Sequence, residues 1–440
     1  MALAKRRVVI TGMGLISPLG SSPAELWDAL QAGQSGVGPL SVTAGGPLPV
    51  DFGAEARQFA NDDIDSFGPL EKEQKKAIRK GLKVMCRECQ MGVAAAQLAL
   101  NDSGIGAGKI AAERIGVVFG ADYMLSMPDD FCEGIAQCLS SAGEFEFSRW
   151  AVEGLPKMSP LWLLKYLPNM PASHMAIYND LRGPNNSLTL REAAANAAVA
   201  EAYQTILRGS ADVMLVGATG TRLHPMKMLH AVQQEEVASV NGDPAVVARP
   251  FDRNRSGVVL GEGAGAVVLE ELEFARARGA RIWGEVLAGS ANSSVGRRLQ
   301  AQRARAMTIA LQAVMRGSGL KADDVGHVHA HGLSTRTCDK DEAEAILTVF
   351  GTRKDPVPVV AAKSNFGNLG AGSGLVELIA SLLALEARRL FPMLNYQTPD
   401  PECPVAVVTD ASTPAGDSFV NLSVTPQGQA SAVLVRRLTG

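Results

Sequence analysis

Short apolar runs recur along the chain, and longer segments of helical character separate them. Runs such as Ile115–Phe119 and Val213–Val216 suit strands that are covered on both faces. The alternation of such strands with helices indicates an α/β architecture. The strands predicted in this way are Val8–Ile10, Ile115–Phe119, Val213–Val216, Val267–Leu269, Val325–Val328, Val359–Ala361 and Ala432–Val435.

Two helices carry clear end signals. Ser22-Pro23-Ala24-Glu25 is a capping box with proline at the first helical position, and the helix that follows should end before Gly33. The alanine-rich segment from Glu192 to Leu207 closes with Arg208-Gly209, which predicts a buried helix with a glycine cap.

Length and composition limit the class of protein. A chain of 440 residues exceeds a typical single core, so two domains or two halves of one large fold are expected. The longest apolar runs, such as Ala264–Leu269, are too short to cross a bilayer. The net charge of −3 provides no basic field for nucleic acid. Because Lys5, Arg6 and Arg7 lead directly into a strand and not into a signal segment, a cytoplasmic protein is expected.

The six cysteines do not form the pattern of a disulfide framework, and their number fits a reducing compartment. Cys86 and Cys89 make a CxxC, but a second CxxC that would complete a zinc site is missing from the sequence. The segment has helical character, so we interpret the pair as two thiols on a helix.

Five motifs occur in a characteristic order. They are Arg7–Gly20, Arg249–Gly257, Gly261–Gly265, His331–Thr335 and Lys363–Asn368. Together they resemble the β-ketoacyl-acyl-carrier-protein synthases over nearly the whole chain. The resemblance implies the thiolase fold, in which two similar βαβαβ halves form a five-layer α-β-α-β-α sandwich.

The resemblance also implies a division of the chain and a dimer. We expect an N-terminal half over residues 1–256 and a C-terminal half over residues 257–440. The irregular stretch of about residues 121–175 resembles the family segment that caps the active site and contributes to the dimer interface, although a plain surface insertion is the alternative. A homodimer, or a heterodimer with a cysteine-bearing ketosynthase, is expected to form through this insertion and the strand at 115–119.

Glu192 stands where these synthases carry their nucleophilic cysteine. A thiolate holds an acyl group as a thioester, whereas a carboxylate would give a short-lived mixed anhydride. His331 matches the first catalytic histidine of the family. Asn368 replaces the second, as in the initiating synthases, and an asparagine can still donate a hydrogen bond to an oxyanion. Ordinary condensation is therefore not expected of this chain.

Two interpretations of Glu192 remain open from the sequence. Thr189-x-x-Glu192 is a capping box, so the glutamate can serve only to close the start of a helix. Alternatively, a carboxylate held beside His331 can act as a general base.

Other residues match positions around the family site. Lys363 and Glu342 match a pair behind the site that orders it, or that survives as a buried ion pair, and Asp339 matches as well. Thr335 is retained as a substrate-binding threonine, whereas Leu333 replaces a threonine that bonds the pantetheine arm. The loop over residues 421–429, which includes Thr425, replaces a glycine-rich loop of the family, so we expect a rebuilt oxyanion loop.

His327, His329 and His331 alternate along a predicted strand, which places them on one face and suggests a metal. Three imidazoles at this spacing reach a common zinc only at a flared strand end, and no acidic fourth ligand is adjacent. We therefore interpret them as structural histidines and expect no metal.

A dense basic cluster precedes the CxxC segment. Carrier proteins are acidic, so their docking surface should be basic, and we assign this role to Arg79, Lys80 and Lys83. A solvated helix face is the alternative. The full cluster is Lys72, Lys75, Lys76, Arg79, Lys80 and Lys83.

Two functions are compatible with these residues. The first is a non-condensing ketosynthase-like subunit of type II fatty-acid or polyketide-type biosynthesis, which would pair with an active synthase and shape its acyl tunnel. The second is an enzyme on acyl-carrier-protein or CoA thioesters that uses Glu192 with His331 and Asn368 for proton abstraction, hydrolysis or decarboxylation. In both, the resemblance implies a substrate on phosphopantetheine and no further cofactor.

Overall fold

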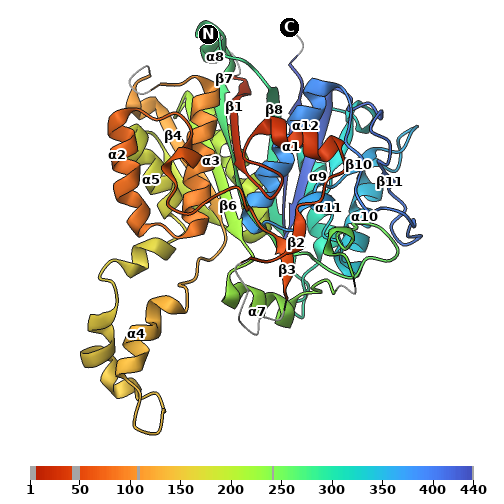
Figure 1. Ribbon diagram of the computed structural model, residues 1–440. Helices are drawn as coiled ribbons and strands as arrows, with labels where there is room; N and C mark the ends of the chain where they lie inside the picture. Colours follow the sequence, from red (N-terminus) through yellow and green to blue (C-terminus); the bar gives the residue numbers. More distant parts are fainter. Residues whose placement is uncertain (1–5, 42–49, 107–109, 240–241, 439–440) are drawn as a thin grey trace.

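The computed structural model describes residues 6–41, 50–106, 110–239 and 242–438. Within them, an eleven-stranded sheet runs through the molecule in the order β11-β10-β9-β12-β13-β8-β1-β7-β6-β4-β5 (Figure 1). Its strands are β1 (Val8–Ile16), β4 (Ile115–Ala121), β5 (Asn185–Thr189), β6 (Val213–Thr221), β7 (Glu262–Glu271), β8 (Gly284–Ser293), β9 (His327–His329), β10 (Pro358–Val360), β11 (Ala406–Val407), β12 (Ser418–Val424) and β13 (Gln429–Arg436). A separate antiparallel pair is formed by β2 (Val37–Pro39) and β3 (Phe52–Ala54).

The long sheet consists of two halves that meet at β1 and β8. These strands pair only at Val8, Val9 and Ile10, so the junction is narrow. β7 pairs with β1 on one side and with β6 on the other, and it therefore belongs to the N-terminal half. The boundary predicted at residue 256 is too early, because the C-terminal half begins only at β8. The alternation of strands along the sequence does not reveal which neighbours each strand pairs with.

Helices complete five layers, as the thiolase fold requires (Figure 1). α3 packs on β1, β6 and β7 at the outer face of the N-terminal half, and α5 packs against α3 and β4. α6 and α12 lie between the two halves, since each contacts strands of both. α9 packs on β8 and β13 at the other outer face, with α10 beside it. These helices are α2 (Lys72–Gly81), α3 (Arg87–Ser103), α5 (Met170–Asn179), α6 (Ala194–Leu207), α9 (Arg303–Ser318), α10 (Arg336–Phe350) and α12 (Ser373–Ala387).

The predicted helix ends can be checked against the structure. Helix α1 (Pro23–Gln31) begins as expected, because the Ser22 side chain accepts a hydrogen bond from the Glu25 amide. α3 begins just after Cys86 and contains Cys89, which confirms that the CxxC lies at a helix. α6 begins two residues later than predicted, after a short 3-10 turn. The remaining α-helices in the described residues are α4 (Asp129–Gln137), α7 (Pro225–Gln234), α8 (Leu272–Ala277) and α11 (Lys363–Phe366).

One segment is more apolar than the sequence analysis recognised. Residues Gly370–Ala387, which include α12, have a mean hydropathy of 1.4 over 18 residues, enough by length and composition to cross a membrane. However, 83% of the segment is buried inside the protein. A helix in the central layer contacts protein on all sides, so an apolar surface all round is expected of it.

Residues 122–169, here called the arm, project from the body beside α2 and α5 (Figure 1). The arm contains α4 and several short turns, and it exposes many large apolar side chains. These are Ile135, Leu139, Phe145, Phe147, Val152, Leu155, Leu161 and Leu163.

The strand at 115–119, which the sequence predicted at a dimer interface, has no free edge for pairing with a second chain. β4, which contains residues 115–119, pairs with β5 and β6 and is therefore internal to the sheet. β5 is the last strand in the order of the described sheet, and its side chains are largely exposed. The prediction of a dimer strand at 115–119 is thus wrong, since both edges of that strand are already hydrogen-bonded.

Candidate functional site

Glu192 lies in a 3-10 turn, η8 (Arg191–Ala193), between β5 and α6. Arg191 has a φ of 50°, a conformation that is uncommon for residues with a side chain. Glu192 is buried, and its Oε1 accepts a hydrogen bond from Asn368 Nδ2 at 3.0 Å. Neither η8 nor α6 has a side-chain cap among the described residues. The capping-box interpretation of Glu192 is therefore wrong, because tertiary partners hold its carboxylate.

Two arginines and a second glutamate surround this carboxylate. Arg222 Nη1 lies 3.3 Å from Glu192 Oε1, and Arg191 Nε lies 3.4 Å from Glu192 Oε2. Both arginines also contact Glu235 Oε1, from Arg191 Nη2 at 2.8 Å and from Arg222 Nη2 at 2.5 Å. We call these four residues the charge cluster. The positive charges of its two arginines equal the negative charges of its two glutamates.

The charge cluster determines the protonation state of Glu192. Burial alone would raise the pKa of this carboxyl, but the charges of Arg191 and Arg222 and the hydrogen bond from Asn368 lower it to about 2. Glu192 is thus an anion at neutral pH. A carboxylate with so low a pKa, held by three donors, has little tendency to accept a proton.

Asn368 has little freedom left. Its Oδ1 accepts from the Gly370 amide at 3.0 Å and lies 3.3 Å from Ser373 Oγ. Its Nδ2, which the family resemblance assigns to an oxyanion, donates to Glu192. The carboxylate of Glu192 therefore takes one of the two hydrogens of this amide nitrogen and, together with Gly370 and Ser373, fixes the orientation of the Asn368 side chain.

His331 follows β9 and faces Lys363, whose Nζ lies 3.4 Å from His331 Nδ1. Because an ammonium group can only donate, Nδ1 accepts, and the proton of the neutral ring is on Nε2. Burial, with the nearby charge of Lys363, holds the pKa of His331 well below its usual value. Glu192 and His331 are close enough for the charge of each to affect the pKa of the other.

The ion pair predicted between Lys363 and Glu342 is not the one found. Lys363 Nζ donates to Glu377 Oε1, and Glu377 belongs to α12. Glu342 accepts from the amides of His331 and Gly332 at 2.6 and 2.8 Å. Glu342 therefore holds the backbone that carries His331, while Glu377 provides the counter-charge for Lys363.

Three further predicted residues lie in or contact the loop between β9 and α10. Asp339 accepts from the amides of Leu333 and Phe251 at 3.0 and 2.9 Å. Thr335 Oγ1 accepts from the Cys338 amide at 3.3 Å and caps α10. Leu333 is buried in the apolar core. In this structure the three residues order the loop after β9.

The expected loop over residues 421–429 is shorter than predicted. Asn421 to Val424 belong to β12, and Gln429 begins β13, so the two strands form a hairpin. Thr425 Oγ1 accepts from the Gln429 amide at 3.2 Å, and Gly428 has a φ of 82° at the turn. Pro426 therefore lies in a tight turn between paired strands.

His327 and His329 share one face of β9, as predicted. Both rings contact Ser381 Oγ, at 3.1 Å from His327 Nε2 and at 2.8 Å from His329 Nδ1. Their other nitrogens contact the Ala415 carbonyl and the Ala362 amide. The described residues contain no group of three or more His, Cys, Asp or Glu side chains placed to hold a metal.

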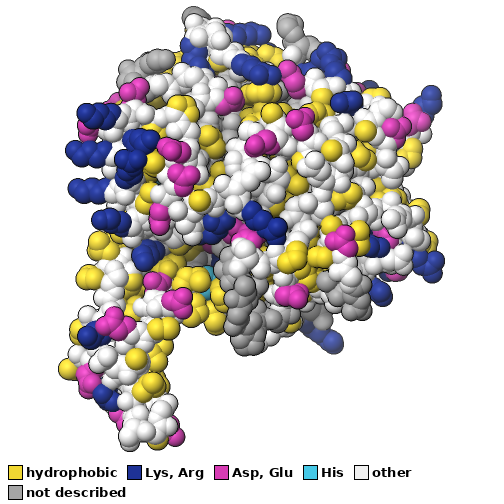
Figure 2. All heavy atoms as spheres, in the orientation of Figure 1, with side chains coloured by type: hydrophobic (Ala, Val, Ile, Leu, Met, Phe, Trp, Pro, Cys, Tyr) yellow, Lys and Arg dark blue, Asp and Glu magenta, His cyan; other side chains and the backbone are white. Residues whose placement is uncertain are grey.

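Five residues of the basic cluster lie on α2 and Lys83 lies in the 3-10 turn that follows it, so the whole cluster precedes α3. Figure 2 shows Lys and Arg side chains gathered over α2, and Arg79, Lys80 and Lys83 are exposed. α2 lies in the outer layer of the N-terminal half, whereas Glu192 and His331 are buried. The predicted docking residues are therefore separate from the predicted catalytic ones.

Sequence reasoning missed four residues of the site. Arg191 and Arg222 contact Glu192, Glu377 contacts Lys363, and Glu235 contacts the two arginines. Arg222 directly follows β6, and ligand sites of α/β folds gather where strands end at their carboxyl side. Glu377 is an acidic residue inside an otherwise apolar helix, which is a signal of its own.

The chain matches two family models, described as Beta-ketoacyl synthase, N-terminal domain, over residues 5–275 and Beta-ketoacyl synthase, C-terminal domain, over residues 284–397. The gap between them coincides with the division between β7 and β8. The 3-oxoacyl-[acyl-carrier-protein] synthase 2 of Synechocystis sp. is 32% identical over 93% of this chain and 92% of its own length. The protein of the same name from Coxiella burnetii is 31% identical over 91% of each chain.

Solved structures give the same result. A beta-ketoacyl synthase from Burkholderia phymatum has a TM-score of 0.84 and 26% identity, over 99% of this chain and 100% of its own. The ishigamide ketosynthase/chain length factor has a TM-score of 0.82 and 26% identity, with the same coverage.

Proposed function

The chain belongs to the beta-ketoacyl synthase family, and on that premise we propose that it is a non-condensing member that pairs with a cysteine-bearing ketosynthase and shapes its acyl tunnel. The observation that carries this proposal is the state of Glu192. Its carboxylate is buried and ionised, and Asn368, Arg222 and Arg191 hold it. A side chain held in this way cannot carry an acyl group through a condensation.

The alternative enzyme, with Glu192 as a general base, has weaker support. A pKa of about 2 leaves the carboxylate with little basicity at neutral pH. Two arginines and one amide compete with any substrate proton for Oε1, whereas Oε2 is buried without a hydrogen-bond partner among the described residues and lies 3.4 Å from Arg191 Nε. His331 Nε2 and the second hydrogen of Asn368 Nδ2 can still donate to a thioester oxygen, but the anionic Glu192 beside them disfavours the build-up of negative charge there.

Partners of this subunit follow from its surface and its relatives. The apolar side chains of the arm need a cover, which a second subunit would supply. One structural neighbour is described as a ketosynthase/chain length factor, and another, at 23% identity, as an acyl-carrier protein in complex with its ketosynthase. We propose a heterodimer or homodimer through the arm and β5, and an acyl carrier protein that docks on α2. Carriage of the substrate on phosphopantetheine, with no further cofactor, and a cytoplasmic location complete this proposal.

Condensation assays test the function. The purified protein is incubated with a labelled acyl carrier and a malonyl carrier, and the Synechocystis relative serves as the positive control. We expect no condensed product from the protein alone. We also expect Glu192→Cys to fall well short of the relative's rate, because Arg222 and Glu235 remain beside the new thiol. Robust elongation by the unmodified protein would overturn the proposal.

A further inference from the structure

A cavity of about 620 Å³ lies beside the charge cluster, and its lining does not include Glu192, His331 or Asn368. Its size is within the range of small-molecule sites. Most of the wall is apolar, and its three methionine side chains make it adaptable to a flexible ligand. The apolar lining includes Phe59, Met85, Met124, Leu125, Met127 and Leu223.

Glu88 supplies a polar group to this wall. It is only 3% exposed and belongs to the first turn of α3. Its Oε2 accepts from Lys227 Nζ at 2.9 Å, but its Oε1 is buried without a hydrogen-bond partner among the described residues. A buried acceptor without a partner is costly, so a ligand that donates to it gains affinity.

The charges around Glu88 determine which donor fits. Lys227 is fully buried and lies over the ring of Tyr123, and Asp122 is close enough for its charge to affect the pKa of Glu88. Asp122 Oδ2 also lacks a partner among the described residues. Because two carboxyl groups face one ammonium group here and both have an oxygen without a partner, a ligand group that donates hydrogen bonds is favoured.

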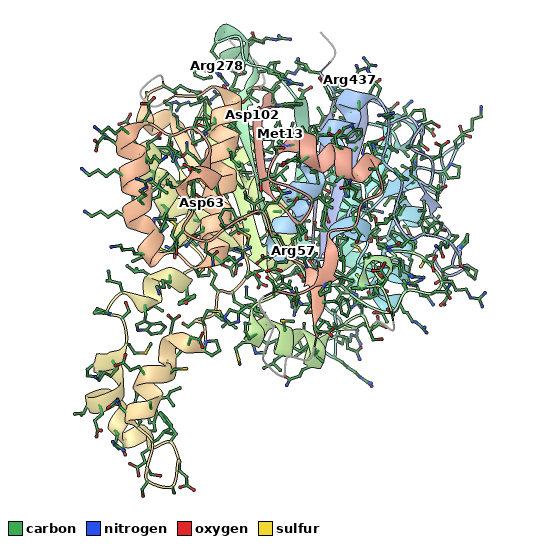
Figure 3. The ribbon with its side chains drawn as sticks, viewed as in Figure 1. Met13, Arg57, Asp63, Asp102, Arg278 and Arg437 are labelled. Atoms are coloured by element: carbon green, nitrogen blue, oxygen red, sulfur yellow. The ribbon has the colours of Figure 1, made fainter. Side chains whose placement is uncertain are left out.

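Two cations of the lining, Arg57 and Lys165, are more exposed to solvent than Glu88, and the lining also contains the carboxylates of Glu55 and Glu262. The Arg57 side chain is 54% exposed, and its ion pair with Glu55 is long, at 3.5 Å. Lys165 also lines the cavity, with a long pair of 3.6 Å to Asp130. Both contacts are longer than a normal hydrogen bond, so both cations can still donate to a ligand anion. Figure 3 places Arg57 at the centre of the view, on the segment after β3.

We propose that this cavity binds an elongated apolar chain with an anionic group at one end and a hydroxyl at the other, as in an ω-hydroxy fatty acid. The hydroxyl donates to Glu88 Oε1, the chain packs on the methionines, and the anion lies near Arg57 and Lys165. This inference goes beyond the proposed function, because none of its residues belongs to the charge cluster and it does not require that the protein lacks condensing activity.

Calorimetry with free fatty acids tests the proposal on the full-length protein. The probes are 12-hydroxydodecanoate and dodecanoate, both used below the concentration at which they aggregate. At pH 8, above the pKa of about 7 for Glu88, we expect the hydroxylated acid to bind at least about tenfold more tightly, since a hydrogen bond to a charged group has this order of effect. Equal affinities, or binding of neither acid, would overturn the proposal.

Paired variants keep the test valid if a single change unfolds the protein. Replacing both partners, as Glu88→Leu with Lys227→Met, removes the buried ion pair without leaving an unpaired charge. In this double variant the ratio of the two affinities should fall to about one. Met127→Leu is the control, because it alters the apolar wall but keeps Glu88, and it should leave the ratio unchanged. A double variant that retains the preference for the hydroxylated acid would contradict the assignment to Glu88.

Discussion

At the scale of single residues, Glu192 and its partners bear most directly on function. The family resemblance assigns the glutamate to the position of a nucleophile, and its contacts are those of a buried ion network with balanced charges. Buried ion networks contribute little net free energy to folding, but the removal of one charged member leaves an uncompensated charge in the protein interior. The stability of the charge cluster is therefore a sensitive test of the structure.

Glu192→Ala should lower the free energy of unfolding by about 3–5 kcal/mol, because Arg191 and Arg222 would then share one carboxylate in a buried site. Glu192→Gln should also destabilise the protein, since it removes the same charge. Urea denaturation measures both. A glutamine variant as stable as the natural protein would contradict the cluster and would favour the capping box.

The control for this experiment is an exposed ion pair. Lys340 and Glu402 pair with both side chains more than half exposed. Glu402→Ala should change the free energy of unfolding by less than about 1 kcal/mol. A similar loss in both alanine variants would show that burial of the charge cluster is not the cause.

Glu88 should give the stability of the protein a distinct dependence on pH. Burial, and the nearby charge of Asp122, raise the pKa of Glu88 from 4.5 to about 7, despite the opposing effect of Lys227. Since the folded pKa lies above the unfolded one, the folded protein keeps a proton that the unfolded chain has lost between these values. Its contribution to stability is complete below pH 4.5 and decreases as the pH rises to about 7.

Glu88→Gln should therefore flatten this decrease. Between pH 5 and 7, the natural protein should lose up to about 1.4 kcal/mol per pH unit more than the variant, which is the value for one proton. Urea denaturation at pH 5, 6, 7 and 8 measures the difference. Parallel curves for the two proteins across this range would exclude a raised pKa for Glu88.

At the scale of elements, α2 presents its basic side chains on the outer layer of the N-terminal half. These side chains are separate from the charge cluster, which is buried in the protein. Its one buried residue is Ile78, so most of the helix is available to an acidic partner. Electrostatic attraction between a basic helix and an acidic partner orients the two proteins and increases their rate of association. This attraction weakens as the salt concentration rises.

Reversal of charge on α2 should weaken the binding of an acyl carrier protein. The variant Arg79→Glu with Lys80→Glu and Lys83→Glu should lower the affinity at least about tenfold at low salt, and the difference should shrink at high salt. The control reverses three exposed cations of the C-terminal half, Arg316, Lys321 and Lys354. Surface plasmon resonance at two salt concentrations measures both. Equal losses from the two variants would reject α2 as the docking site.

At the scale of the whole molecule, the arm and β5 give the fold two incomplete surfaces. The arm exposes apolar side chains that a monomer would leave in water, and β5 ends the described sheet with an edge that another strand can pair with. Both features favour a stable assembly over a monomer.

Charged substitutions on the arm should disrupt this assembly. Phe147 and Val152 are 76% and 78% exposed, and the double variant Phe147→Glu with Val152→Glu should shift the protein toward monomer in light scattering at micromolar concentration. Leu299 is 89% exposed but lies outside the arm, so Leu299→Glu is the matched control and should leave the mass unchanged. A natural protein that is monomeric under these conditions would contradict the prediction.

The sequence alone determined the local features and the family. Apolar runs identified strands such as β1, β4, β6 and β7, Ser22 marked the start of α1, and the ordered motifs identified the family. These signals are short in range, since each depends on residues that are near one another in the chain.

The tertiary structure alone decided what these residues contact. Asn368 and Glu192 are 176 positions apart, and Arg222 is 30 positions from Glu192. Which strands adjoin in the sheet determines such contacts, and the order of strands also assigned β7 to the N-terminal half and made β5 the last strand. The sequence therefore gave no means to choose between a helix cap and a general base for Glu192, or to pair Lys363 with Glu377. Those choices depend on charges that only the packing of the two halves brings together.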